Sequence, residues 1–240
     1  MKKLAVTIAG GGVRSTVGIG VLEYLEENNI QVDAISGSSA GAIIAILYGY
    51  GVSIKEIKEI VEEMNFKDFL NIQYNSLLSL KSMEKMLKAR LAGRTQQIPI
   101  EIAITNQKTM KPEYIREGNL IKAVIASASL KVFFKSVKID NEKYRDGGYS
   151  NNLPYINFHN EGYYTIAVKA RFSKLKKRRF HKKVCKTIKY PDLKPDLLIK
   201  VDDVGHISTF ELTKTSFIVE SGYKKAKEEI NIEELKKELK

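Results

Sequence analysis

The sequence has only one cysteine, Cys185, and no long uninterrupted hydrophobic segment. A single cysteine cannot form a disulfide within its own chain, and a free thiol is typical of a reducing compartment, so we expect a cytoplasmic protein. The longest apolar run without a charge spans residues 40–52, which is shorter than the about 20 residues of a membrane-spanning helix. The N-terminal apolar run, residues 4–9, is shorter than the core of a secretion signal, so we expect a buried strand.

Histidine is also scarce, and the three in the chain, His159, His181 and His206, lie in no recognisable motif. We expect each of them to be a surface or loop residue. With 240 residues, 43% of them hydrophobic, the chain has enough apolar material for a core that needs no metal or disulfide support. The core therefore needs no structural metal, and we expect no cofactor.

Acidic residues are absent from residues 171–189, although the segment holds ten of the basic residues. The formal net charge of the whole chain is +12, so the remainder is close to neutral. Three interpretations are open for this basic loop: contact with an anionic membrane, binding of nucleic acid, or a solvated loop. The basic residues are Arg171, Lys174, Lys176, Lys177, Arg178, Arg179, Lys182, Lys183, Lys186 and Lys189.

The hydrophobic pattern alternates between short β-rich runs and helical spacing. It predicts strands at residues 4–9, 32–36, 99–105, 165–169 and 197–201, and a hairpin of residues 137–139 and 143–145. It predicts helices at residues 17–29, 42–48 and 119–127, two or three amphipathic helices within 54–91, and a final helix from about 210 to 230. Strands that alternate with helices indicate an α/β layered fold.

Gly37-Ser38-Ser39-Ala40-Gly41 matches the G-x-S-x-G pattern of a nucleophilic serine on a sharp strand-to-helix turn. Small neighbours are needed because the backbone is strained and crowded there. The register selects Ser39, since Gly37 and Gly41 flank it at the required spacing, whereas Ser38 has Ser36 and Ala40. The helix that follows can stabilise developing negative charge through its N-terminus.

Gly10-Gly11-Gly12-Val13-Arg14 lies between the first predicted strand and helix. Successive glycines can point backbone N–H groups inward and form an anion nest, which suits the oxyanion of an acyl intermediate. A dinucleotide loop is the alternative, with Asp33 at a plausible distance for a ribose, but that pattern needs a glycine where Ser15 stands. A P-loop is excluded because no Gly-Lys-Ser/Thr follows.

Asp146-Gly147-Gly148 follows the predicted hairpin, and its glycines would let Asp146 approach a crowded site. A carboxylate hydrogen-bonded to a serine can act as its general base. On its own, this tripeptide is most often a turn.

Together these motifs resemble the patatin-like phospholipase family. Further similar segments are Val21 to Glu26, Ala126 to Ser129, Asn151 to Pro154 and the C-terminal run to Tyr223. The resemblance covers nearly the whole chain, so it implies one three-layer α/β/α domain over residues 1–240 with a mainly parallel central sheet. Two residues depart from the family pattern, Ser15 where a glycine is usual and Lys131 where many members have proline.

The resemblance also implies an activity, that of a lipid acyl hydrolase working without a metal. It implies a dyad of Ser39 as nucleophile and Asp146 as general base. The oxyanion hole would come from the loop that contains Gly10, Gly11, Gly12 and Val13. For such an enzyme we expect residues 171–189 to contact an anionic membrane. Helices within 54–92 would form a lid, an acyl-chain wall or ordinary packing.

Two other functions remain as alternatives. A Ser-His-Asp esterase of the α/β-hydrolase type would use Ser39, Asp146 and one of the three histidines, but Ser39 comes too early in the chain for the central strand of that sheet. A non-enzymatic nucleotide or nucleic-acid binder would use the glycine loop and the basic loop. The oligomeric state and the exact lipid cannot be inferred from these residues.

Overall fold

The computed structural model describes residues 2–63, 80–131, 133–170 and 193–239. The strands are β1 (Leu4–Ile8), β2 (Ala34–Ser38), β3 (Ile100–Asn106), β4 (Pro112–Ile115), β5 (Val137–Ile139), β6 (Glu142–Asp146), β7 (Tyr164–Ala170) and β8 (Leu197–Val201). The α-helices are α1 (Val17–Glu27), α2 (Ala40–Gly49), α3 (Ile54–Glu63), α5 (Lys81–Leu91), α6 (Leu120–Ser127), α7 (Ile156–Asn160), α9 (Thr215–Glu229) and α10 (Ile232–Leu239). Short 3-10 helices are η1 (Gly12–Thr16), η2 (Gly147–Tyr149) and η4 (Leu212–Lys214).

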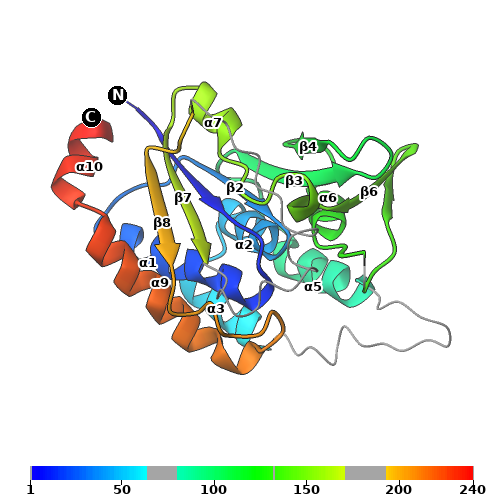
Figure 1. Ribbon diagram of the computed structural model, residues 1–240, viewed down its shortest axis with the longest axis horizontal. Coiled ribbons are helices and arrows are strands. Elements are labelled where there is room, and N and C mark those ends of the chain that lie inside the picture. The colour runs from blue at the N-terminus through cyan, green and yellow to red at the C-terminus, as the bar shows by residue number, and fades with distance from the viewer. Residues whose placement is uncertain (1, 64–79, 132, 171–192, 240) are drawn as a thin grey trace.

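All eight strands belong to one sheet with the order β5-β6-β3-β2-β1-β7-β8, and β4 pairs with β3. The strands from β3 to β8 in this order are parallel, whereas β4, β5 and β6 add antiparallel pairs at one side. This confirms the predicted mainly parallel α/β sheet. In Figure 1 the arrows of β1, β7 and β8 end on the same side of the molecule, so the loops that follow them gather there.

The two faces of the sheet differ in side-chain size. One face carries large aliphatic residues, including Ile8, Ile35 and Ile100, and all three are fully buried. Helices α1 and α2 lie on this face, because their glycines Gly18 and Gly49 press against those isoleucines. Burial of this apolar surface is the main contribution to the stability of the fold.

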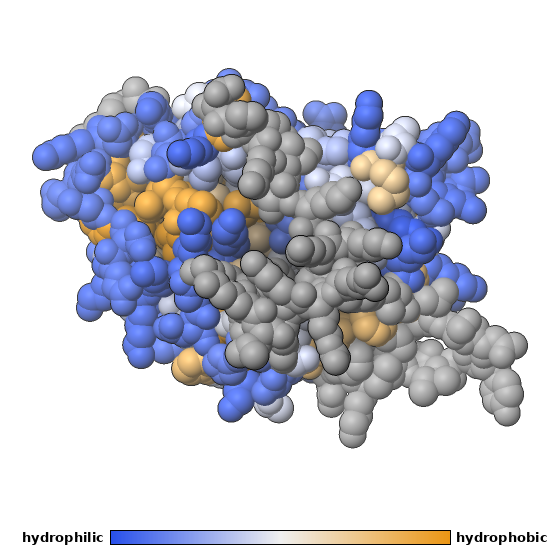
Figure 2. All heavy atoms as spheres, in the orientation of Figure 1, coloured by the Kyte–Doolittle hydropathy of each residue, from blue (hydrophilic) through white to orange (hydrophobic). Residues whose placement is uncertain are grey.

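The opposite face is built from small and hydroxyl side chains. Thr7 and Ser36 are partners in the β1–β2 register, and their hydroxyls lie 2.7 Å apart. Phe158 of α7 packs on Ala5 and Ala34. Small residues let the chain that follows Asp146, the last residue of β6, approach the sheet closely, and Oγ of Ser36 donates a 2.8 Å bond to the carbonyl oxygen of Pro154. In Figure 2, apolar residues reach the surface over β7 and β8, whereas most other described residues in this view are hydrophilic.

Helices α1 and α9 are in close contact although they come from opposite ends of the chain (Figure 1). A Cβ on Gly20 would lie 2.0 Å from the carbonyl oxygen of Val219, and a Cβ on Gly222 would lie 2.1 Å from that of Val17. The glycines therefore permit backbone contact between the helices. This contact holds the C-terminal segment beside the glycine loop that precedes α1.

Within the described residues the predicted elements are confirmed, with three additions and some shifted ends. The second strand is Ala34–Ser38 rather than residues 32–36, and the final predicted helix begins at Thr215, after η4. The hydrophobic pattern missed β4, α7 and α10. Residues 64–79 of the predicted lid or wall, and the whole basic loop 171–189, lie outside the described residues. Among the residues that are described, no helix combines the length and apolarity needed to cross a membrane.

Candidate active site

Ser39 lies in the sharp turn between β2 and α2, as its motif predicts. Its backbone has φ of 53° and ψ of −126°, a left-handed φ that is strained for a residue with a side chain. The flanking glycines are required by close approach, because a Cβ on Gly37 would lie 2.4 Å from the carbonyl oxygen of Gly41. A Cβ on Gly41 would in turn lie 2.3 Å from the carbonyl oxygen of Ile8. The turn therefore holds the Ser39 hydroxyl above the carboxyl end of the sheet.

The hydroxyl of Ser39 donates a 2.6 Å hydrogen bond to Oδ2 of Asp146. The other carboxylate oxygen, Oδ1, accepts a 2.8 Å bond from the backbone N–H of Gly148. Asp146 is only 1% exposed. Burial raises the pKa of Asp146 from the ordinary 3.8 to about 7, although the bonds from Ser39 and Gly148 lower that pKa in part.

Asp146 reaches the serine because β6 pairs with β3, which lies next to β2. The hydroxyl of Thr105 on β3 donates a 2.7 Å bond to the carbonyl oxygen of Asp146. Gly147 has no room for a side chain, since a Cβ there would lie 2.2 Å from the carbonyl oxygen of Ala103. These contacts explain why Asp146 is followed by glycine.

The glycine loop lies directly against the serine. A Cβ on Gly10 would lie 2.6 Å from Oδ1 of Asn152 and 2.8 Å from Cβ of Ser39. The N–H of Gly10 donates to the carbonyl oxygen of Asn152 at 3.3 Å, and that of Val13 donates to the carbonyl oxygen of Thr209 at 2.9 Å. Of the four residues predicted to supply the oxyanion hole, Gly11 and Gly12 have N–H groups with no acceptor among the described residues.

A cavity of about 120 Å³ opens beside Ser39 and is almost entirely apolar. It lies between the glycine loop, helices α2, α3 and α5, and the segment before η4. Its lining includes Ile43, Val61, Met83, Phe134 and Phe210. Phe210 is 36% exposed and makes an edge-on contact with Phe133, with 5.2 Å between the ring centroids. A nucleophile beside an apolar cavity suits an ester with a hydrocarbon acyl chain.

The family model described as patatin-like phospholipase matches residues 6–159. This range is more than half of the chain and contains the glycine loop, Ser39 and Asp146. The chain belongs to the patatin-like phospholipase family.

Curated relatives of this patatin-like chain match only parts of its length. Uncharacterized protein YqhO of Bacillus subtilis is 38% identical over 76 residues, which are 32% of this chain and 26% of YqhO. Patatin-like phospholipase domain-containing protein 7 of Rattus norvegicus is 30% identical over 165 residues, 63% of this chain and 12% of that protein. Lysophospholipase nte1 of Aspergillus fumigatus is 26% identical over 163 residues, 63% of this chain and 11% of its own length. The matches thus span about a quarter or less of these relatives.

Two solved structures share the patatin-like fold. VipD from Legionella pneumophila aligns over 95% of this chain and 66% of its own, with a TM-score of 0.65 and 15% identity. The type III effector protein ExoU aligns over 100% of this chain and 54% of its own, with a TM-score of 0.50 and 13% identity. At these identities the likeness concerns the fold alone.

Three residues of the patatin-like site were not assigned a role by the sequence. Ser127 at the end of α6 accepts a 2.8 Å bond from the N–H of Ser39 and donates a 2.6 Å bond to the carbonyl oxygen of Ala103. Asn152 exchanges bonds with Gly10, since its Nδ2 donates to the carbonyl oxygen of Gly10 at 3.0 Å. Ser127 and Asn152 belong to segments that resemble the family. That resemblance was the only sequence feature that could have pointed to a role for them in the site.

Thr209 is the third such residue, and no sequence signal pointed to it. It covers Gly12, whose Cβ would lie 2.3 Å from Cγ2 of Thr209. Arg14 holds the segment that contains Thr209 in place through two hydrogen bonds. Its Nη1 donates a 2.7 Å bond to the carbonyl oxygen of Ile207, and its Nη2 donates a 3.1 Å bond to Oγ1 of Thr209. Arg14 is 2% exposed. It acts as a buried anchor between the glycine loop and the segment before η4.

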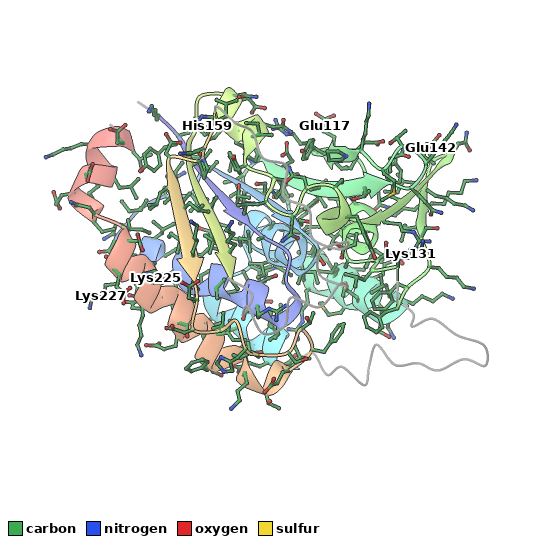
Figure 3. All side chains as sticks on the ribbon, in the orientation of Figure 1. Glu117, Lys131, Glu142, His159, Lys225 and Lys227 are labelled. Atoms are coloured by element: carbon green, nitrogen blue, oxygen red, sulfur yellow. The ribbon has the colours of Figure 1, made fainter. Side chains whose placement is uncertain are left out.

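The hydroxyl of Ser39 donates to Asp146 rather than to either of the two described histidines. His159 lies on α7 at the amino-terminal side of the sheet (Figure 3), where its Nδ1 is 3.4 Å from Oδ2 of Asp196. His206 is exposed in the loop after β8, and His181 lies outside the described residues. In the described ranges, no group of histidine, cysteine and acidic residues is arranged to hold a metal ion.

Proposed function

We propose that this protein is a serine lipid acyl hydrolase that cleaves carboxylic ester bonds of phospholipids or related lipids. The observation that carries the proposal is the direct 2.6 Å hydrogen bond from Ser39 to Asp146 beside an apolar cavity. Membership of a family described as phospholipases supports the substrate class. Ser39 is assigned as the nucleophile and Asp146 as the general base.

Acylation begins when Oγ of Ser39 attacks the carbonyl carbon of the ester and its proton passes to Oδ2 of Asp146. The tetrahedral oxyanion is stabilised by the N–H groups of Gly11 and Gly12, which have no acceptor among the described residues. The bond to the alcohol oxygen then breaks, and Asp146 returns its proton to that oxygen. The products of this half-reaction are the free alcohol and an acyl ester on Ser39.

Deacylation repeats these steps with water. Asp146 accepts a proton from the water as its oxygen attacks the acyl carbonyl carbon. The bond to Oγ of Ser39 then breaks, and Asp146 returns the proton to the serine. A fatty acid leaves, and no metal or cofactor takes part in either half of the proposed cycle.

The environment of Asp146 supports the role of base. An exposed carboxylate is a weak base at neutral pH, whereas burial raises the pKa of Asp146 to about 7. A general base is most effective when its pKa lies near the working pH. The bond from Gly148 N–H holds the carboxylate in the orientation that leaves Oδ2 for Ser39.

The proposed acyl-binding element is the apolar cavity beside Ser39. Its lining residues Ile43 and Ile44 come from α2, which begins next to the nucleophile. A hydrocarbon chain placed there would be removed from water, at about 0.8 kcal/mol for each buried methylene group. For the basic loop 171–189 we keep the proposal of peripheral contact with an anionic membrane, with the protein itself in the cytoplasm. Nucleic acid is the less favoured partner.

A fluorophosphonate probe tests the proposal directly, because it modifies an activated serine. We expect the probe to label the wild-type protein and not Ser39→Ala. Ester hydrolysis should likewise be present in the wild-type protein and absent from Ser39→Ala. A lipid panel of phospholipid, lysophospholipid and monoacylglycerol then defines the ester. A folded wild-type protein that resists the probe and instead retains nucleotide or RNA would overturn the hydrolase assignment.

A further inference from the structure

The cavity beside Ser39 contains one buried hydroxyl that has no hydrogen-bond partner. Oγ of Ser15 is inaccessible to solvent and makes no hydrogen bond to any described group, and Ser15 as a whole is 3% exposed. A buried polar group without a partner is rare in native proteins and is destabilising. Its presence calls for a partner that arrives from outside the protein.

The other hydroxyls that line the cavity are already engaged. Oγ of Ser39 donates to Asp146. Oγ1 of Thr16 donates a 2.7 Å bond to the carbonyl oxygen of Val13. Oγ1 of Thr209 accepts from Arg14. Ser15 also lines the cavity and differs from these neighbours because its Oγ makes no hydrogen bond to any described group.

The position of Ser15 relates this donor to the reacting ester. Ser15 belongs to η1, immediately after the glycine loop, and lines the same cavity as Ser39. Its Oγ lies 3.6 Å from the point where a Cβ on Gly11 would stand. Gly11 and Gly12 carry the two N–H groups assigned to the oxyanion. The hydroxyl of Ser15 is thus beside the loop that carries the proposed oxyanion donors.

We propose that Ser15 is a catalytic residue whose hydroxyl donates a hydrogen bond to the carbonyl oxygen of the acyl substrate and strengthens that bond in the tetrahedral intermediate. The assignment rests on the proposed acyl hydrolase function. The family that the sequence resembles usually has a glycine at this position, where no hydroxyl exists. The donor supplements the N–H groups of Gly11 and Gly12.

The physical consequence is an opposition between activity and stability. No described group compensates the desolvation of the Ser15 hydroxyl in the free protein, so we expect its removal to stabilise the fold. In the transition state the same hydroxyl is paired with an oxyanion, so its removal slows the reaction. A hydroxyl with a merely structural role would not raise the melting temperature when it is deleted.

The test compares Ser15→Ala with the wild-type enzyme on a short-chain p-nitrophenyl ester. We expect kcat to fall about 10- to 100-fold, with KM within about twofold of the wild-type value. The inhibition constant of an alkyl trifluoromethyl ketone, which forms a tetrahedral adduct with the serine, should weaken by the same factor as kcat/KM. The Tm should rise by about 2–4 °C.

Ser221→Ala is the matched control, since Ser221 is a buried serine of α9 outside the cavity and its Oγ donates a 2.8 Å bond to the carbonyl oxygen of Phe217. It should keep the wild-type kcat and should not gain stability. The inference is overturned if Ser15→Ala keeps the wild-type kcat and inhibitor affinity, if only KM changes, or if lost activity accompanies a lower Tm. Absence of Ser39-dependent hydrolysis in the wild-type protein would instead overturn the proposed function.

Discussion

The hydroxyl of Ser39 and the carboxylate of Asp146 are joined by a 2.6 Å hydrogen bond across 107 residues of sequence. Ser39 comes from the turn after a parallel strand, whereas Asp146 comes from the end of an antiparallel strand on the other side of β3. The bond leaves no place for an intervening imidazole between the two groups. It is the contact that a direct dyad requires, whereas in a triad the carboxylate only orients a histidine.

The first prediction separates the dyad from the triad. Asp146→Asn should reduce kcat by about 10⁴-fold, close to the effect of Ser39→Ala, because Asp146 is the base that accepts the hydrogen bond of the serine. His159→Ala, His181→Ala and His206→Ala should each retain most of the activity. Steady-state kinetics on a soluble ester measures these effects. A histidine variant that is folded and as inactive as Ser39→Ala would restore the triad.

The second prediction concerns pH. With the pKa of Asp146 at about 7, kcat/KM should rise through neutral pH as the carboxylate ionises and becomes able to accept the proton. The measurement is a pH profile of kcat/KM on a neutral short-chain ester. An activity already at its full value at pH 5 would contradict the raised pKa of the base.

The stability of the fold gives an independent check on the pKa of Asp146. Ionisation of Asp146 should raise activity but lower the free energy of unfolding. Because burial raises the pKa of Asp146 above its ordinary 3.8, the folded state binds the proton more tightly than the unfolded state. The contribution of Asp146 to stability is therefore lost as the pH rises from about 4 to about 7, by an amount on the order of 4 kcal/mol. Asp146→Asn should gain stability relative to the wild-type protein between pH 5 and pH 8. Urea unfolding at pH 5 and pH 8 measures the difference in free energy of unfolding between the variant and the wild-type protein. If that difference is the same at both pH values, the raised pKa of Asp146 is contradicted.

The third prediction compares two neighbouring glycines of the loop. Gly10→Ala should abolish activity, because the new Cβ would lie 2.8 Å from Cβ of Ser39 and 2.6 Å from Oδ1 of Asn152. Gly11→Ala should remain folded and within about tenfold of wild-type activity, since its backbone φ of 174° is open to any residue and the nearest atom to its Cβ is 3.6 Å away. Kinetics and circular dichroism of both variants test this contrast. Equal loss in both would show that loop flexibility, rather than close approach, is what matters.

The fourth prediction concerns the acyl cavity. Val61 of α3 is 6% exposed and lines the cavity, so Val61→Phe should fill part of it. Activity on long-chain p-nitrophenyl esters should fall more than activity on the acetate, by about tenfold in the ratio of their kcat/KM values. Val61→Ala should enlarge the cavity instead and raise kcat/KM on bulkier acyl chains relative to the acetate. A constant chain-length profile across the three proteins would exclude this cavity as the acyl site.

The fifth prediction concerns the basic loop 171–189. Replacing Lys176, Lys177, Arg178 and Arg179 by neutral residues should weaken binding to anionic vesicles and leave hydrolysis of a soluble ester unchanged. The binding of the wild-type protein should fall as salt is added, because ions screen the attraction. Vesicle co-sedimentation at low and high salt is the measurement. Binding that ignores both the charges and the salt would remove the membrane-docking proposal.

The elements that the sequence predicted correctly are those with a strong local pattern. Residues 17–29 show helical spacing, and Ala34–Ser38 and Ile100–Asn106 lie within or beside short β-rich runs. By contrast, β4 begins at Pro112, and a strand can start with proline only where its missing N–H is not needed for the sheet. Helix α7 has five residues, too few for a helical period to be visible. Its position depends on Phe158 packing against small residues of β1 and β2.

The sequence by itself determined the chemical groups of the site and the local turns that present them. The glycines that flank Ser39 and those that follow Asp146 can be recognised in the local sequence, because the crowding that requires glycine acts on the backbone next to each residue. Only the tertiary structure decided which groups meet. The residue type determines which hydrogen-bond donors and acceptors a side chain has. Which of them form bonds depends on contacts between distant segments of the chain. The carbonyl oxygens of Asn152 and Thr209 accept the N–H groups of Gly10 and Val13, whereas Oγ of Ser15 makes no hydrogen bond to any described group.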